Sequence, residues 1–255
     1  MLLLPTQKLA LLFPVKTASQ TLQARLESLG VRPYPKLFHF NPHLRRITHQ
    51  HLTLSDWAAL PEHDQGYQLA VFVRNPYDRV FSGFIQLQRN FQVLPRLQYP
   101  EPWIRERVLE QLARAWAGAS RAGFDVNRWF QQLPEHEILD AGQGGTLCLH
   151  PCIYWTHRGK ELGVDFLGKV EHFEADFDRL RARYGIGETN RLDANRSDAA
   201  LASADSDQYL YARRLAPGTI DRINVLFRQD FDRLGYDRIV PPRAGADGVT
   251  RTSSA

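Results

Sequence analysis

Residues 68–82 read QLAVFVRNPYDRVFS, and this stretch decides the fold class. Its beginning, Gln68–Val73, is an apolar run with the length of a buried β-strand. Arg74 and the asparagine after it end the run. Pro76 suits the first turn of a helix, which we expect to continue to about Gln88. A strand that passes through a short turn into a helix is the first half of a βαβ unit.

The same order of elements occurs nearer the N-terminus. Residues 8–13 (KLALLF) are a short apolar run, residues 16–21 (KTASQT) are small and polar, and residues 22–29 carry leucines at helical spacing. A late strand is expected over residues 165–170, followed by a helix over residues 173–184. Strands that alternate with helices predict an α/β fold, with a central, mostly parallel sheet that helices flank on both faces.

Weaker patterns predict further elements. We expect short strands over residues 34–40 and 49–54, and helices over residues 101–122, 124–133 and 217–234. The segment 191–207 is rich in Asn, Asp, Ala and Ser and is expected to be a loop. A polar tail over residues 241–255 is expected to be disordered, which leaves residues 1–240 as a single domain.

Composition limits the class of protein. The 255 residues are 43% hydrophobic and 24% charged, which is ordinary for a globular chain able to bury a substantial core. The net charge of +4 is too small to indicate nucleic-acid binding, but it suits an anionic ligand if the basic residues cluster. Cys148 and Cys152 are too few for a disulfide scaffold or a metal site. They could pair across a loop, although free thiols are favoured.

No targeting or membrane segment is evident at the N-terminus. The sequence Met1–Pro5 lacks a basic region and a cleavage site, and the apolar residues 9–13 run directly into a loop. No run approaches the roughly 20 apolar residues of a membrane span. We therefore expect a cytoplasmic protein without an anchor. The sequence does not reveal its oligomeric state.

The first candidate site is the segment 14–21 (PVKTASQT), between the first strand and the first helix. Backbone N–H groups at a helix N-terminus, together with the helix dipole, attract anions. Lys16 would add a positive charge. The segment is no Walker A loop, because the two glycines are missing and the lysine opens the loop. An ordinary strand–helix turn would explain the same residues.

The second candidate site begins at Arg74. It follows the strongest predicted strand, so it lies at the carboxyl edge of the sheet, where open α/β folds bind ligands. Arg74 could grip a phosphate with two hydrogen bonds, and Ser82 could add a hydroxyl if the helix faces back toward it. A structural ion pair between Arg74 and Asp78 is an equally good explanation.

The third candidate site is the pair His49 and His51. In an extended segment, two residues at this spacing point to the same face. Histidine is the usual general base near neutral pH, although such a pair more often serves a structural or surface role.

Taken in order, these segments resemble the carbohydrate sulfotransferase family (sulfotransferase family 2), most of all the uronyl and heparan sulfate 2-O-sulfotransferases. Those enzymes have a Pro-Lys-Thr-Ala-Ser loop, a His-Gly-His segment and an Arg-Asp/Asn-Pro segment, and Gly168 to Asp176 is similar to a stretch of the chondroitin members. The likeness covers residues from about 9 to 236 in patches. Here Pro14 stands one place early, Gln20 replaces a small hydroxyl residue, and Gln50 replaces the glycine.

The resemblance implies a sulfotransferase fold with a P-loop-like site for 3′-phosphoadenosine 5′-phosphosulfate (PAPS). It implies transfer of the sulfuryl group to a glycan or small hydroxyl-bearing acceptor, with 3′-phosphoadenosine 5′-phosphate (PAP) as product and no metal. His51 would be the base and Lys16 would act on the donor. His49 would contact the acceptor or orient His51, and His150 and Tyr154 would contact the acceptor. The implied PAPS-binding residues are Lys16, Thr17, Ala18, Ser19, Gln20, Thr21, Arg74, Ser82 and Arg196.

Some alternatives remain open. A protein of the same fold that binds a nucleotide or an anionic glycan without turnover would carry the same segments. A P-loop kinase of small molecules is disfavoured by the missing glycine-rich loop. Glu171 follows a strand and could be structural or could support the site. The tryptophans at 103, 116, 129 and 155 could stack on sugar rings or belong to the core. The relatives in eukaryotes carry a Golgi anchor, so a chain without one suggests a bacterial relative.

Overall fold

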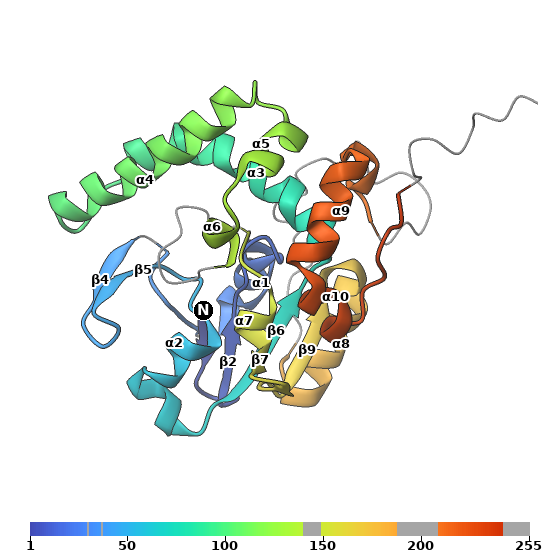
Figure 1. The fold of residues 1–255 in the computed structure, drawn as a ribbon. Helices are drawn as coiled ribbons and strands as arrows, with labels where there is room; N and C mark the ends of the chain where they lie inside the picture. Colours follow the sequence, from blue (N-terminus) through green and yellow to red (C-terminus); the bar gives the residue numbers. More distant parts are fainter. Residues whose placement is uncertain (30, 37, 140–148, 188–208, 242–255) are drawn as a thin grey trace, which may run out of the picture.

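The computed structural model describes residues 1–29, 31–36, 38–139, 149–187 and 209–241 (Figure 1). It confirms the α/β class, with a central sheet that helices cover on both faces. The strands are β1 (Leu2–Leu4), β2 (Leu9–Leu12), β3 (Arg32–Pro33), β4 (His39–Asn41), β5 (Arg46–Thr48), β6 (Gln68–Val73), β7 (His157–Arg158), β8 (Glu161–Leu162) and β9 (Phe166–Lys169). The α-helices are α1 (Ser19–Leu26), α2 (Leu54–Ala58), α3 (Pro76–Val93), α4 (Pro102–Arg121), α5 (Val126–Gln132), α6 (Glu135–Leu139), α7 (Ile153–Thr156), α8 (Phe173–Tyr184), α9 (Pro217–Leu226) and α10 (Arg228–Leu234).

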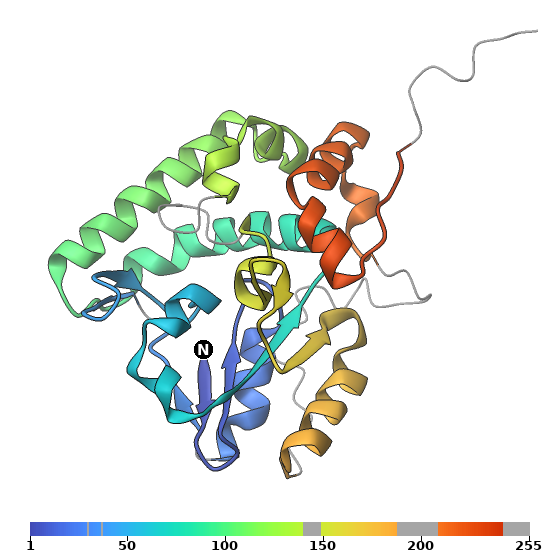
Figure 2. The same ribbon diagram turned by 60° about the horizontal axis from the view of Figure 1, so that its bottom comes forward.

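The main sheet is largely parallel. Its order is β3-β1-β2-β6-β9, and the three strands β2, β6 and β9 run in the same direction, as their arrowheads in Figure 2 show. β1 pairs antiparallel with both β2 and β3 at one edge. Leu12 at the end of β2 lies opposite Val71 of β6, so the two strands finish near each other. The turns that follow them therefore share one edge of the sheet.

The side chains of the strands alternate between two cores. Leu9, Leu11, Ala70 and Phe72 pack on one face with α1 and α8. The residues between them face the other side, where they join the larger core under α2, α3, α5, α7, α9 and α10. This period of two is what a sheet covered on both faces requires.

Three expected elements differ in the structure. Residues 34–40 are no single strand, because β3 ends at Pro33 and β4 forms a separate hairpin with β5. Residues 49–54 are no strand either, because Thr53 caps α2. The expected helix 217–234 is two helices, α9 and α10. The backbone leaves the helical conformation at Phe227 (φ −101°, ψ 21°), while the apolar spacing continues across the break.

Other expectations hold or fall outside the described residues. The helices expected over 101–122, 124–133 and 173–184 are present as α4, α5 and α8. β1 was missed because three residues are too few for a recognisable period. The loop expected over 191–207 and the tail from 242 onward lie outside the described residues. In the described part of the chain, no helix is both long and apolar enough to cross a membrane.

Candidate functional site

Two strand–helix turns lie side by side at the carboxyl edge of the sheet. The first turn is the segment between β2 and α1, and the second turn is the pair of residues between β6 and α3. The two are directly connected, since Arg79 of α3 donates from Nε to the carbonyl oxygen of Val15 at 3.4 Å. The structure thus brings together the two segments that the sequence singled out for anion binding.

The first turn has an unusual backbone. Lys16 (φ 67°) and Ala18 (φ 60°) both adopt the left-handed conformation, which costs a residue with a side chain about 1–2 kcal/mol. Such strain persists where the surrounding structure imposes it, and it gathers at ligand sites. The loop is closed by Thr17, whose buried hydroxyl donates to the carbonyl oxygen of Pro14 at 2.8 Å. Left-handed residues within a turn point successive N–H groups inward, which forms an anion-binding concavity.

The start of α1 also favours an anion. Ala18 at the N-cap position provides no side-chain hydrogen bond to the helix, and no acidic residue stands in the first turn. Most helices satisfy these N–H groups with a capping side chain. Here the positive end of the helix dipole faces the same loop as Lys16.

Hydrogen bonds to Asn75 hold the backbone of the second turn. Asn75 caps α3 by accepting a hydrogen bond from the N–H of Asp78 at 2.8 Å. Glu171, which follows β9, accepts hydrogen bonds from the backbone N–H and the side-chain amide of Asn75, each at 2.8 Å. It also accepts one from the Tyr236 hydroxyl at 3.1 Å. Glu171 therefore holds the backbone beside Arg74.

One face of α3 runs between the two turns. Asp78, Ser82 and Gln86 are spaced four residues apart, so they follow each other along one side of the helix over about 12 Å. Asp78 contacts the Arg74 guanidinium at 3.5 Å, and Gln86 accepts a hydrogen bond from Lys16 Nζ at 3.0 Å. Ser82 lies midway and is buried. The helix thus faces both cations, which is the condition on which a role for Ser82 depended.

The contact between Arg74 and Asp78 is the ion pair that the sequence left open as an alternative. It is long, at 3.5 Å. Asp78 has other partners, because it accepts hydrogen bonds from the N–H groups of Leu210 and Tyr211 at 3.2 and 2.8 Å. The Arg74 guanidinium also lies over the Tyr211 ring, 5.6 Å from its centre. The carboxylate thus remains well satisfied if Arg74 turns to a ligand.

His51 is fixed at the base of the first turn. Its Nδ1 lies 2.8 Å from the carbonyl oxygen of Phe13, the first residue after β2. A carbonyl oxygen can only accept, so Nδ1 carries the proton and Nε2 is the basic nitrogen. The Gln50 amide nitrogen is 3.4 Å from Nε2, and Gln23 of α1 donates to Gln50 at 2.6 Å. This chain of amides orients the imidazole.

Both histidines have lowered pKa values, which favours the neutral imidazole near pH 7. Burial, followed by the charge of His49, lowers the pKa of His51 well below its usual 6.5, and the charge of Lys16 adds a smaller effect. Burial lowers the pKa of His49 to about 4. The two rings meet edge to face with centres 5.0 Å apart, and His49 Nδ1 accepts the backbone N–H of His51 at 3.1 Å. They share one side of the chain although the segment is not a strand.

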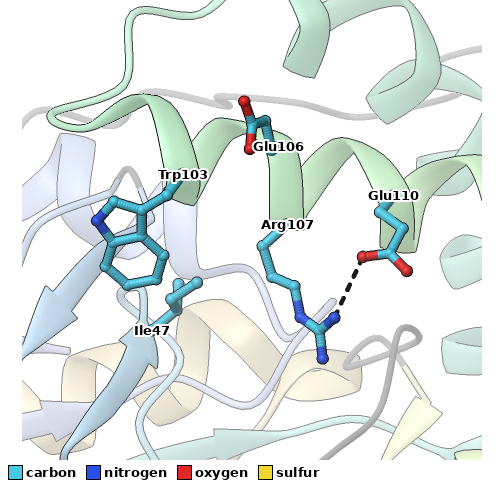
Figure 3. A pocket seen from close by; sticks show the side chains of 5 residues that line it. All are labelled: Ile47, Trp103, Glu106, Arg107 and Glu110. Atoms are coloured by element: carbon cyan, nitrogen blue, oxygen red, sulfur yellow. Dashed lines mark hydrogen bonds and ion pairs between the residues drawn. The ribbon is translucent and has the colours of Figure 1, made fainter.

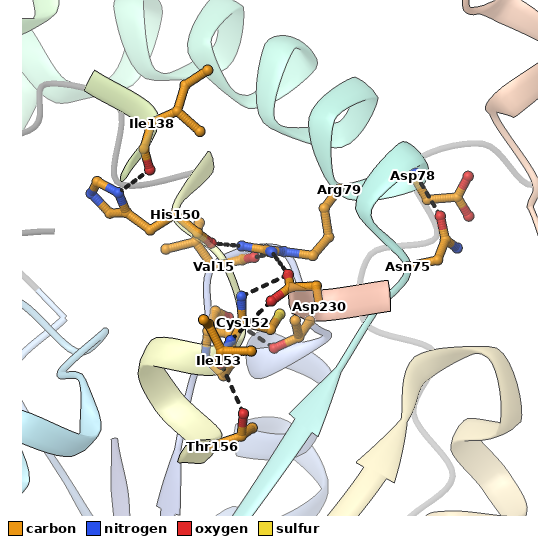
Figure 4. A network of polar contacts seen from close by, with 12 residues as sticks. Val15, Asn75, Asp78, Arg79, Ile138, His150, Cys152, Ile153, Thr156 and Asp230 are labelled. Atoms are coloured by element: carbon orange, nitrogen blue, oxygen red, sulfur yellow. Dashed lines mark hydrogen bonds and ion pairs between the residues drawn. The ribbon is translucent and has the colours of Figure 1, made fainter. Parts of the chain in front are cut away.

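A buried ion pair ties the first turn to the C-terminal helices (Figure 4). Arg79 and Asp230 are both almost fully buried and lie 3.3 Å apart. Arg79 also donates to the carbonyl oxygen of His150 at 2.6 Å, and Asp230 accepts the N–H groups of Cys152 and Ile153 at 2.8 and 3.0 Å. The sequence predicts no role for Arg79. Its burial and its contacts with distant residues are evident only in the folded chain.

The remaining predicted residues lie elsewhere. His150 is fully buried and bonds to the carbonyl oxygen of Ile138 at 2.7 Å, so its ring offers no surface to an acceptor in this conformation. Tyr154 is partly buried and donates to the carbonyl oxygen of Leu139. Cys152 is a buried free thiol whose pKa burial raises to about 12. Arg196 and Cys148 lie outside the described residues.

Within the described ranges, no three His, Cys, Asp or Glu side chains gather closely enough to hold a metal ion.

Comparison with known proteins gives one match. The model of the sulfotransferase family matches residues 2–237, which include every strand and helix described above. No curated protein and no solved structure matches the chain.

Proposed function

The chain belongs to the sulfotransferase family and is thus a PAPS-dependent transferase, and we propose that it moves the sulfuryl group onto a carbohydrate hydroxyl with His51 as general base. Family membership supplies the donor and the reaction type. The acceptor and the roles of individual residues are our proposal, and they follow from the geometry of the two turns.

The observation that carries the proposal is the face of α3 that joins Lys16 to Arg74. A donor with phosphates at both ends needs two separate cationic sites at a fixed distance. Arg74 and Ser82 would hold the 3′-phosphate, which distinguishes PAPS from nucleotides such as ATP. Arg196 is proposed as a further phosphate ligand. The well-braced second turn keeps Arg74 at a constant position for this purpose.

The first turn would hold the 5′-phosphosulfate. Its strained backbone and the uncapped start of α1 provide the donors, and Lys16 provides the charge. Lys16 would exchange its hydrogen bond with Gln86 for one with the oxygen that bridges phosphorus and sulfur. The proposed ligands in this turn are Lys16, Thr17, Ala18, Ser19, Gln20 and Thr21.

The proposed reaction is an in-line displacement at sulfur. The acceptor oxygen forms a bond to sulfur while the bond from sulfur to the bridging oxygen of PAPS breaks. The acceptor proton passes to Nε2 of His51, and the electron pair of the broken bond leaves with PAP. Lys16 stabilises the charge that develops on that oxygen. His51 is suited to its role, because the bond from Nδ1 to Phe13 makes Nε2 the basic nitrogen, and the acceptor hydroxyl would take the place of the Gln50 amide nitrogen beside it.

A carbohydrate acceptor is favoured by the resemblance to the 2-O-sulfotransferases, which extends to the paired histidines. His49 lies beside His51 and is the nearest candidate for contact with the acceptor. Tyr154 and His150 were implied to bind the acceptor as well. The burial of His150 makes it the weakest of the three.

Two assays separate this function from its alternatives. Incubation with ³⁵S-labelled PAPS and a panel of glycans should yield a labelled glycan, whereas a binding protein without turnover would yield none. Thermal unfolding should shift upward with PAP and much less with ATP, because only PAP has the 3′-phosphate. An equal or larger shift with ATP would favour the kinase alternative.

A further inference from the structure

The ring of Tyr211 lies against the cation that is proposed to bind the 3′-phosphate. The Arg74 guanidinium is over this ring, 5.6 Å from its centre. That distance is within the roughly 6 Å over which the negative face of an aromatic ring attracts a cation. Tyr211 is 5% exposed, whereas the Arg74 side chain remains 16% exposed. The ring is thus shielded from water, while the guanidinium can still be reached from solvent.

Contacts with α3 fix the position of the ring. Asp78 accepts hydrogen bonds from the backbone N–H groups of Tyr211 at 2.8 Å and of Leu210 at 3.2 Å. The ring stacks on that of Phe81, with centres 4.8 Å apart and planes 13° apart. Asp78 and Phe81 are three residues apart on α3 and therefore lie on the same side of the helix. The helix holds the ring beside Arg74, which precedes its first residue by two positions.

An arginine that has an aromatic ring nearby does not always adopt this arrangement. Trp103 and Arg107 both line a groove of about 550 Å³ at α4 (Figure 3). There the guanidinium of Arg107 points to Glu110 and pairs with it at 3.1 Å. The Arg74 guanidinium instead lies over the face of its aromatic neighbour. The ring of Tyr211 is therefore a specific partner of this cation.

The ring contact is compatible with a bound phosphate. An arginine can contact an aromatic ring through the flat face of its guanidinium and still use the N–H groups at the edge for a phosphate. The contact with Asp78 is made by Nη2 of Arg74, one of the nitrogens at that edge. A phosphate would therefore replace the Asp78 contact and leave the contact with Tyr211 in place.

We propose that Tyr211 is a positioning residue for the 3′-phosphate: its ring holds the Arg74 guanidinium at the place where the phosphate binds. This inference rests on the proposed function, in which Arg74 is the phosphate ligand. A cation that is held in place before binding loses less conformational freedom on binding, which raises the affinity. The role belongs to the ring and not to the hydroxyl, so a phenylalanine should fulfil it.

The first test measures the affinities for PAP and for adenosine 5′-phosphate by calorimetry. Tyr211→Leu keeps an apolar side chain but removes the ring. It should weaken PAP binding about five- to tenfold and leave the binding of adenosine 5′-phosphate nearly unchanged, because only PAP has the 3′-phosphate. Tyr211→Phe should bind both nucleotides like the wild type. Losses of equal size for the two nucleotides, or no loss for either, would overturn the proposal.

Phe130→Leu is the matched control for lost core packing. Phe130 is fully buried on α5 in the same hydrophobic core, and the Arg222 guanidinium lies over its ring, 5.4 Å from the centre. This variant should lose stability, as Tyr211→Leu does, and keep the wild-type ratio of the two affinities. A change of that ratio as large as in Tyr211→Leu would show that the ratio follows stability alone, which would refute the proposal.

A second series of variants keeps the shape of the ring, and it serves also if Tyr211→Leu does not fold. Phenylalanines with increasing ring fluorination at position 211 have nearly the same size, but fluorine withdraws negative charge from the ring face that attracts the cation. The affinity for PAP should fall stepwise with the number of fluorine atoms, and the affinity for adenosine 5′-phosphate should not. A PAP affinity that is independent of fluorination would contradict the proposal.

A double-mutant cycle separates this inference from the proposed function. If the ring acts through Arg74, Tyr211→Leu should cause no further loss of PAP affinity in a protein that already carries Arg74→Ala. An unchanged ratio of the two affinities in Arg74→Ala alone would refute the assignment of Arg74 in the proposed function. A changed ratio in Arg74→Ala, combined with a separate and additive loss from Tyr211→Leu, would support that assignment and refute the role of Tyr211.

Discussion

In both the first and the second turn, a parallel strand leads into a helix. The two turns differ in how their backbone and the start of the helix are stabilised. The second turn has its cap in Asn75, a carboxylate in Glu171 behind it and no left-handed residue. The first turn has two left-handed residues, Lys16 and Ala18, and no capping side chain. The second turn has a side-chain cap at the start of its helix, whereas the first turn has none.

This difference supports different roles for the two turns in the proposed function. A rigid turn is suited to hold one cation, Arg74, at a constant place for binding. A strained turn would suit the end of the donor where charge changes during the proposed reaction, because strained backbone gathers at ligand sites. Changes in the first turn should therefore mainly alter turnover, and changes in the second should mainly alter affinity and stability.

The largest effect is expected from the base beside the first turn. His51→Ala should lower turnover by about 10²–10⁴ and leave the affinity for PAP nearly intact, since the imidazole acts on the acceptor. Transfer of ³⁵S from labelled PAPS measures the first quantity, and calorimetry with PAP measures the second. His49→Ala is the control. If His49→Ala is the inactive variant and His51→Ala retains full turnover, the base is misassigned.

The pH profile tests the same assignment. The proposed base acts in its neutral form, so activity should be lost as the pH falls through the pKa of His51 in the folded protein. Burial and the charge of His49 lower that pKa well below 6.5. The acidic limb of kcat/KM should therefore lie below pH 6.5, and it should be absent from the residual activity of His51→Ala. A limb above pH 7 would contradict the buried, neutral imidazole.

Within the first turn, Lys16→Ala should lower turnover by about a hundredfold or more, with a much smaller effect on PAP binding. The lysine is proposed to stabilise charge that appears only as the donor bond breaks. Single-turnover kinetics with saturating PAPS isolates that step. Lys8→Ala, at the opposite end of β2, should behave like the wild type. Full activity of Lys16→Ala would remove the first turn from the chemistry.

In the second turn, Arg74→Ala should weaken PAP binding by about ten- to a hundredfold, the value of a charge-assisted hydrogen bond. The affinity for adenosine 5′-phosphate should change little, because that nucleotide lacks the 3′-phosphate. The ratio of the two affinities is the measurement, and Arg32→Ala at the sheet edge is the control. An unchanged ratio would place the 3′-phosphate elsewhere.

The hydrogen bonds of Asn75 in the second turn are expected to stabilise the folded protein. Asn75→Ala removes the cap of α3 and one of the two donors to Glu171, and should lower the free energy of unfolding by about 1–2 kcal/mol. Asn75→Ser, which retains a capping oxygen, should lose less. Urea titration measures both. Equal stability of Asn75→Ala and wild type would show that the two turns do not differ in bracing.

The smallest effect is expected from relief of strain in the first turn. Ala18→Gly should raise the free energy of unfolding by about 0.5 kcal/mol, because glycine adopts the left-handed conformation without penalty but gains freedom when unfolded. Turnover should also fall, if the rigidity of the first turn contributes to the reaction. Gly123→Ala, at another left-handed position, should shift stability the opposite way.

The sequence predicts the elements of this molecule that depend on residues close together in the chain. The apolar run of β6, the proline that starts α3 and the loop around Lys16 are all evident in neighbouring residues. The strand β1 and the hairpin β4–β5 are too short for a period. The bond from Lys16 to Gln86 joins residues 70 positions apart, and no local pattern contains it. The lowered pKa of His51 likewise arises from burial, which only the folded chain determines.

The ion pair between Arg79 and Asp230 has a consequence for synthesis on the ribosome. The two residues are 151 positions apart, and Asp230 belongs to the last helix of the described fold. Until α10 has emerged, Arg79 would be a buried charge without its counterion, a state that costs about 3–5 kcal/mol. The same guanidinium supports Val15 in the loop that carries Lys16. The last contact that holds Arg79, and through it the carbonyl oxygen of Val15, therefore forms only after residue 230 has been synthesised.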